Sequence, residues 1–159
     1  MFLTNPIIYF LNTNGVTVLV LFILVILFID SRNREVFWHA VVVFFVTVVV
    51  VALLKELFNM PRPFEATNVV PLAGLTQLPS FPSGHAATAF AVSTVVALHR
   101  KRLGIFFLIL SSLIAIGRVA ANVHYPIDVT FGMLVGVMIA LFFDTLHMKI
   151  RGKKRKLHS

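Results

Sequence analysis

The chain has 159 residues, of which 58% are hydrophobic, and a formal net charge of +8. The hydrophobic fraction exceeds the roughly 45–50% that is usual in soluble domains, and it is concentrated in long runs almost free of charge. These runs argue against a soluble nucleic-acid-binding protein despite the basic charge. The absence of cysteine excludes disulfides, thiolate metal ligands and a cysteine nucleophile.

The apolar runs predict an all-α fold, namely a polytopic transmembrane helix bundle that forms one membrane domain over residues 1–148. The first twelve residues are too few to span a bilayer, and their apolar character predicts a short interfacial helix. They also lack the basic region of a cleavable signal peptide. Five spanning helices are expected to follow, which makes six helices in total, at residues 15–29, 36–58, 84–98, 103–121 and 127–146.

The connection over residues 59–82 is the one long loop, and it holds five of the seven prolines. Because proline interrupts both helices and sheets, we expect neither in this segment. Several of its side chains are apolar, among them Phe64, Leu72, Leu75 and Phe81. We expect the loop to lie against the bilayer surface or to cap a pocket, where these apolar residues would form a gate. Its polar side chains, including Glu65 and Ser80, are candidate readers of a small headgroup.

The fourteen Lys and Arg residues are distributed unevenly between the two ends of the predicted helices. Eleven lie at one end, including the basic tail at residues 149–159. The positive-inside rule places this end in the cytoplasm, so the C-terminus is expected inside. Lys55, Arg62 and Arg118 are the three exceptions, and they lie at the extracytoplasmic end.

These three residues belong to a larger candidate site, because each candidate functional group is expected at the same, extracytoplasmic end of its helix. Cationic side chains stabilise a phosphoryl group in transfer. A helix that begins at Ser83, Gly84 and His85 offers free backbone N–H groups to an anion. His124 and Asp128 are four residues apart, so the carboxylate can orient the imidazole as a nucleophile. His85, on a separate helix, can protonate a leaving oxygen.

The spacing of these residues resembles the signature of the type 2 phosphatidic acid phosphatase family, which shares its active site with vanadium haloperoxidases and glucose-6-phosphatase. The three parts read KELFNMPRP over 55–63, PSGH over 82–85 and GRVAANVHYPID over 117–128. Gly117 is the one departure, because the family has serine there. Among bacterial members, the sequence of these stretches is most similar to undecaprenyl pyrophosphate phosphatases. This similarity implies a protein of the inner (cytoplasmic) membrane of a bacterium.

The resemblance implies a role for each matching position. His124 would attack phosphorus to form a phosphohistidine, Asp128 would orient and activate it, and His85 would protonate the leaving group and then activate water. The other matching residues would bind phosphate: Lys55, Arg62, Ser83, Gly84 and Arg118. The resemblance also implies six helices, a metal-independent hydrolase and no cofactor.

The expected substrate is a lipid phosphate monoester or pyrophosphate in the membrane, with undecaprenyl pyrophosphate favoured. Phosphatidylglycerophosphate, phosphatidic acid and lipid A phosphates stay open, as does a lipid phosphotransferase with the same site. A soluble haloperoxidase is disfavoured by the five expected spans. An anion transporter is disfavoured because the span interiors carry no ionisable residue. Nucleic acid is not an expected partner, and the sequence defines no oligomeric state.

His85, His124 and Asp128 superficially form a two-histidine, one-carboxylate metal triad. Three nearby cations would repel a divalent metal, so no metal is expected at this site. The remaining histidines are interpreted as ordinary interfacial side chains, because they lie near the inner helix ends or beside basic segments: His39, His99, His147 and His158.

Overall fold

The computed structural model of the protein describes residue 10 and residues 13–29, 34–67 and 78–157. These residues form helices and connecting turns without a β-strand, so the predicted all-α class is confirmed. The expected interfacial helix over residues 1–12 falls almost wholly outside them. The helices are α2 (Gly15–Ile29), α3 (Arg34–Phe58), α4 (Pro63–Thr67), α5 (Gly84–His99), α6 (Lys101–Ala120) and α7 (Pro126–Leu157).

The five long helices occupy the five predicted segments, with bounds that differ by two residues or fewer except at the end of α7. α7 continues eleven residues beyond the predicted end at 146 into the basic tail, where lysine and arginine are good helix formers. The prediction that residues 59–82 hold no helix was wrong for Pro63–Thr67, which forms α4. Pro63 is the first residue of α4, a position where the missing N–H of proline costs nothing.

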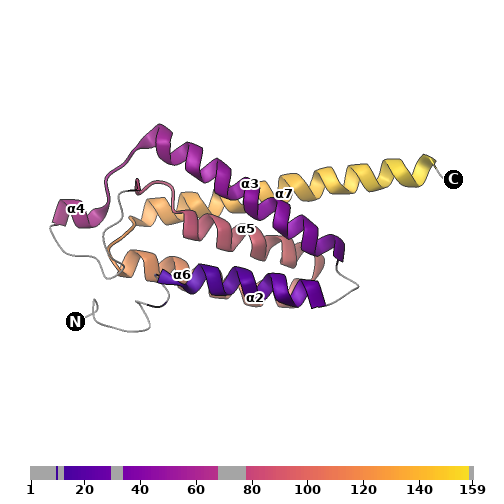
Figure 1. The fold of residues 1–159 in the computed structure, drawn as a ribbon, viewed down its shortest axis with the longest axis horizontal. Helices are drawn as coiled ribbons and strands as arrows, with labels where there is room; N and C mark the ends of the chain where they lie inside the picture. Colours follow the sequence, from indigo (N-terminus) through magenta and orange to yellow (C-terminus); the bar gives the residue numbers. More distant parts are fainter. Residues whose placement is uncertain (1–9, 11–12, 30–33, 68–77, 158–159) are drawn as a thin grey trace.

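α5 is the central helix of the bundle and contacts α2, α3, α6 and α7 (Figure 1). All residues from 86 to 96 are buried, and most are alanine, serine, threonine or valine. Such small side chains let neighbouring helices approach closely, which is how helices pack inside a bilayer. Two hydroxyls, Ser93 on α5 and Ser111 on α6, bond to each other at 2.9 Å within this packed interior.

The contact between α5 and α7 depends on two glycines four residues apart on α7. A Cβ atom at Gly132 would lie 2.5 Å from the carbonyl oxygen of Ser83, and one at Gly136 would lie 2.1 Å from that of Ala87. Both distances are impossible for a real side chain, so the two backbones are in direct contact. This contact fixes the start of α7 beside the start of α5.

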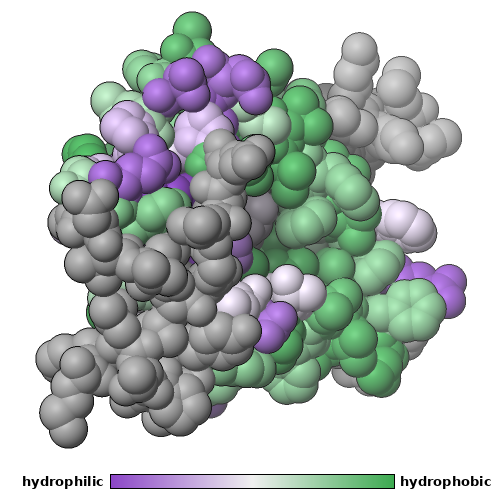
Figure 2. Space-filling model, turned by 60° about the vertical axis from the view of Figure 1, so that its left-hand side comes forward, coloured by the Kyte–Doolittle hydropathy of each residue, from purple (hydrophilic) through white to green (hydrophobic). Residues whose placement is uncertain are grey.

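The outer surface of the bundle is suited to lipid. Three segments are long and apolar enough to cross a membrane, namely Arg34–Ala66, Lys101–Ala120 and Pro126–Lys149, whereas α2 and α5 are apolar but shorter. Large hydrophobic side chains such as Phe28, Phe45 and Phe142 are more than 60% exposed. In Figure 2, hydrophobic side chains cover most of the visible helix surface, and hydrophilic ones gather mainly at the upper left. The length criterion therefore supports three of the five predicted spans.

Candidate active site

All eight residues predicted for the site come together at one end of the bundle. The C-terminal ends of α3 and α6 and the N-terminal ends of α5 and α7 meet there. These elements supply cationic side chains, a helix N-terminus and a histidine–carboxylate pair, from Lys55, Arg62, Ser83, Gly84, His85, Arg118, His124 and Asp128.

His124 and Asp128 form a buried pair. The Nδ1 atom of His124 lies 3.4 Å from Oδ2 of Asp128, and the two residues are 2% and 1% exposed. The backbone N–H of Tyr125 donates to the same carboxylate oxygen at 2.9 Å. A proton on Nδ1 is placed to be donated to this carboxylate, which leaves the lone pair of the imidazole on Nε2. The pair therefore holds Nε2 and its lone pair in a defined orientation.

A short turn between α6 and α7 brings Arg118 and His124 into one site. α6 ends at Ala120, and Asn122 then adopts a left-handed conformation with φ of 58°. Asparagine tolerates this conformation better than most residues. Pro126 begins α7, and Asp128 lies in its first turn. The backbone N–H of Ser83 also donates to the carbonyl of Asp128 at 2.9 Å, which joins this turn to α5.

Ser80 is a site residue that the sequence analysis placed wrongly, because it is not exposed as a headgroup reader. It is completely buried, its hydroxyl donates to Oδ2 of Asp128, and its Oγ lies 3.5 Å from Nδ1 of His124. Ser80 lies two positions before the PSGH motif, and no periodic or motif signal marks it. The hydroxyl holds the carboxylate that in turn orients the imidazole, so Ser80 is a positioning residue.

Ser80→Ala is expected to lower kcat by roughly 10- to 100-fold with little change in KM, because it removes a hydrogen bond to a charged group. Steady-state kinetics of phosphate release measures both constants. Ser112→Ala is the matched control, since the Ser112 hydroxyl bonds only within α6, to the carbonyl of Leu108. A wild-type kcat in Ser80→Ala would remove Ser80 from the positioning of Asp128.

Two of the cationic side chains also hold the loop that precedes α5. The Lys55 ammonium donates to the carbonyls of Pro79 and Ser80. The Arg62 guanidinium donates from Nε to the carbonyl of Leu78 at 2.8 Å and from Nη1 to that of Val123 at 3.0 Å. Arg62 therefore connects the loop before α5 to the turn before α7.

The site carries an excess of buried positive charge. Arg62 and Arg118 are 4% and 5% exposed, and Lys55 acts electrostatically on both. Asp128 is the one buried carboxylate that faces them among the described residues. Because buried charge is costly without a partner, the site favours a multiply charged anion. The Ser83-capped N-terminus of α5 adds backbone N–H groups and a helix dipole of the same sign.

The electrostatic environment keeps the His124 imidazole neutral. The pKa of His124 is lowered to about 4, chiefly by burial, while the hydrogen bond to Asp128 raises it and the positive charges of Arg118 and Arg62 act in the same direction as burial. At neutral pH the Nε2 lone pair is therefore available for attack. His85 lies in the first turn of α5 and acts electrostatically on His124, Arg118 and Arg62, so the second imidazole shares the same site.

The fold and the site define a class of protein, an integral membrane protein whose cationic site is suited to a phosphate group. More specifically, the chain belongs to the PAP2 superfamily, which matches residues 35–151. Gly117, where the phosphatase signature has serine, is buried beside Arg118 at the end of α6.

Two curated relatives and one solved structure are similar over most of the chain. Bacitracin transport permease protein BcrC of Bacillus licheniformis is 34% identical over 140 residues, covering 87% of this chain and 69% of that protein. Undecaprenyl-diphosphatase BcrC of Bacillus subtilis is 28% identical, covering 87% and 72%. The crystal structure of Aquifex aeolicus LpxE superposes with a TM-score of 0.75 and 30% identity, covering 89% and 87%. Family and relatives together identify the chain as a membrane phosphatase.

Proposed function

We propose that this protein hydrolyses a phosphate monoester or pyrophosphate of a lipid, with undecaprenyl pyrophosphate as the favoured substrate. The observation that supports a lipid is an apolar groove of about 420 Å³ between α2, α3 and α5. Lys55, Gly84 and His85 are the site residues among its lining, whereas the rest of the lining is almost entirely apolar. A phosphate at the cationic site can therefore have its hydrocarbon chain in the groove.

The groove favours entry of the lipid from the bilayer, between α2 and α3. Leu21 and Val48 line it and are 56% and 42% exposed, so it opens on the hydrophobic outer surface. Phe64 and Phe81, which the sequence suggested as parts of a gate, are buried instead. Leu72 and Leu75 of the same suggested gate lie outside the described residues.

In the first chemical step, Nε2 of His124 attacks phosphorus while the bond from phosphorus to the leaving oxygen breaks. The electron pair of that bond goes to the leaving oxygen, which takes a proton from His85. The product is a phosphohistidine and a free lipid alcohol, or a lipid monophosphate when the substrate is a pyrophosphate. Asp128 stabilises the positive charge that develops on the imidazole.

In the second step, water attacks phosphorus and gives a proton to the neutral His85. The bond from phosphorus to Nε2 breaks, its electron pair returns to His124, and inorganic phosphate leaves. Throughout both steps Lys55, Arg62 and Arg118, together with Ser83, Gly84 and the N-terminus of α5, bind the equatorial oxygens. None of these steps requires a metal, so hydrolysis is expected to continue in the presence of a chelator.

A transport function, which the name of the Bacillus licheniformis relative describes for that protein, receives less support. A path for an ion needs polar groups through the bundle. The buried polar side chains between the two ends of the described helices are hydroxyls, at Thr47, Thr88, Ser93, Thr94 and Ser111, and Ser93 and Ser111 bond to each other.

The substrate is tested by phosphate release from a panel of lipids in mixed micelles. Undecaprenyl pyrophosphate is expected to give a higher kcat/KM than phosphatidylglycerophosphate, phosphatidic acid or lipid A phosphates. Appearance of a new phospholipid in place of free phosphate would identify a phosphotransferase. Activity on a small soluble phosphate ester but on no lipid would contradict the proposal.

Val48→Trp is expected to raise KM for the lipid substrate about tenfold or more, because the indole fills the groove and removes roughly 1.4 kcal/mol or more of lipid binding. Hydrolysis of a small soluble phosphate ester should stay unchanged, since the cationic site is not altered. Val49→Trp is the control, because Val49 is the adjacent exposed valine of α3 and lies outside the groove. Equal effects of both variants on the lipid would contradict a role of the groove.

The site is proposed to face away from the cytoplasm, because the basic residues outside the site lie at the opposite end of the helices. A cysteine at Ala66, exposed on α4, should react with a membrane-impermeant reagent in intact cells. A cysteine at Lys101, exposed at the start of α6, should not react. The chain has no native cysteine, so the background is low. The reverse pattern would place the site in the cytoplasm.

A further inference from the structure

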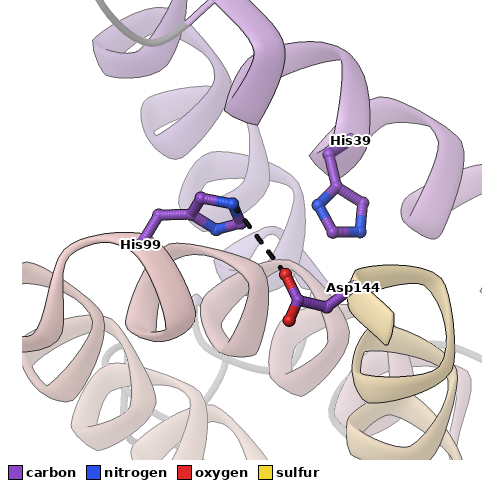
Figure 3. Close-up of side chains that lie close together, drawn as sticks. All are labelled: His39, His99 and Asp144. Carbon is purple, nitrogen blue, oxygen red and sulfur yellow. Dashed lines mark ion pairs between the residues drawn. The ribbon is translucent and has the colours of Figure 1, made fainter. Parts of the chain in front are cut away.

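Three titratable side chains meet at the end of the bundle opposite the candidate active site. His39 of α3, His99 of α5 and Asp144 of α7 each offer a ligand atom, and these atoms lie within 4.8 Å of one another (Figure 3). The Nε2 atom of His99 is 3.9 Å from Oδ1 of Asp144. α5 has 16 residues, so this cluster lies about 24 Å from the phosphate site.

His39 has no hydrogen-bond partner in the described structure, although it is only 8% exposed. Both of its ring nitrogens are buried, and a buried nitrogen without a partner costs free energy. Figure 3 shows its ring directed toward Asp144. The ring also stacks on that of His147, with 5.6 Å between centroids. A ligand that accepts the lone pair of His39 would remove this cost.

His99 is already oriented as a metal ligand would be. Its Nδ1 lies 2.9 Å from the carbonyl oxygen of Val95, so the proton of the neutral ring is on Nδ1 and is donated to that carbonyl. The lone pair is then on Nε2, the nitrogen that faces Asp144. Donation from the second ring nitrogen to a backbone carbonyl is how proteins commonly orient metal-bound histidines.

We propose that His39, His99 and Asp144 bind a divalent transition metal, for which Zn²⁺ is the best match, with His147 as the fourth ligand. Zn²⁺ accepts imidazole and carboxylate ligands in tetrahedral geometry, with donor atoms about 3.3 Å apart. His147 follows Asp144 by three residues on α7, on the same helix face. The metal would draw the donor atoms from their present separations to this spacing by side-chain rotation, and it would join α3, α5 and α7.

The cluster lies at the basic end of the bundle, but its immediate charged neighbours are histidines and carboxylates. The groups that act electrostatically on His39 among the described residues are His99, His147 and Asp144, with no lysine or arginine. Glu35 lies close by, with its Oε2 atom 3.9 Å from Nε2 of His147. The proposed metal site is therefore separate from the phosphate site in both position and charge.

The test uses full-length protein purified with a tag that contains no histidine. The protein is treated with a chelator, the chelator is removed, and Zn²⁺ alone is added. Equilibrium dialysis with elemental analysis should show one tightly bound Zn²⁺ per chain. Co²⁺ in its place should give the intense visible absorption of a four-coordinate site. Zn²⁺ at about one hundred times its Kd should raise Tm by roughly 5 °C or more.

His39→Gln and Asp144→Asn should each lose the tight Zn²⁺, the Co²⁺ absorption and the Tm increase. Asp144→Asn changes little volume at a partly exposed position, so it remains informative even if His39→Gln does not fold. His124→Gln in the phosphate site and His158→Gln in the tail are the controls and should retain all three properties. Absence of tight Zn²⁺ in the wild type, or equal binding by Asp144→Asn, would overturn the proposal. So would loss of binding in either control.

Discussion

His124→Ala is expected to lower kcat by more than about 10³-fold while the protein remains folded in detergent. Removal of a nucleophile leaves only substrate binding and electrostatic stabilisation by the remaining groups. Asp128→Asn is expected to have a comparable effect, because a neutral amide accepts the Nδ1–H bond more weakly than a carboxylate and carries no charge to stabilise the developing imidazolium. The measurement is single-turnover release of phosphate from the lipid substrate.

Two further variants separate chemistry from folding. His124→Gln keeps most of the buried volume and should be as inactive as His124→Ala, whereas His158→Gln in the tail should be fully active. Circular dichroism and the elution volume on size-exclusion chromatography confirm the fold of each variant. In the wild type, a radiolabelled phosphate should be trapped on the protein in an acid-labile form. Substantial turnover by His124→Gln, or label retained by it, would exclude His124 as the nucleophile.

Gly136→Val is expected to destabilise the protein by about 3 kcal/mol or more, near the upper limit for overpacking. The new side chain cannot avoid the backbone of α5, since even its Cβ would lie 2.1 Å from the Ala87 carbonyl oxygen. The two helices must separate, and with them His85 and His124. Tm in detergent should therefore fall by roughly 6–12 °C, with a parallel loss of activity.

Met138→Val is the control for this variant, because Met138 lies on the same helix but is 67% exposed on its outer side. Its replacement should leave both Tm and activity close to the wild-type values. If Gly136→Val unfolds no earlier than Met138→Val, the direct backbone contact between α5 and α7 does not contribute to stability.

Much of the site was predictable because its signals are local in sequence. The His124–Asp128 pair lies within a single turn, so its spacing alone predicts the contact. A cationic residue at the end of an apolar helix has few possible roles, which made these residues candidates for the site. Each predicted site residue lies at the expected end of its helix. The bounds of the long helices followed for the same reason, since an apolar run and its flanking prolines are read directly from the sequence.

The residues that were missed depend on contacts between distant segments. Ser80 acts on Asp128 from 48 residues away, and a lone serine in a proline-rich loop has no pattern that reveals it. The ligands of the proposed metal site, His39, His99 and Asp144, are ordinary when each is considered alone, and only the packing of three helices brings them together. α4 was missed because five residues are too few to show helical periodicity.

The hydrophobicity of a helix did not predict whether the helix is enclosed by protein or exposed to lipid. α2 and α5 are both short and apolar, yet α5 is enclosed by protein whereas α2 carries several exposed large side chains. The distinguishing signal is side-chain size, since the small residues of α5 suit helix contacts and the large ones of α2 suit lipid.

The lateral opening of the groove between α2 and α3 has a consequence for how the enzyme encounters its substrate. An enzyme that takes its substrate from within the bilayer samples a two-dimensional solution. Its rate then follows the mole fraction of substrate among the surrounding lipids and is insensitive to the volume of water. Adding inert lipid at a constant amount of substrate slows such an enzyme, although no inhibitor is present. On the proposed function, the same dilution would act in the cell, where the abundance of all other lipids would set the occupancy of the groove.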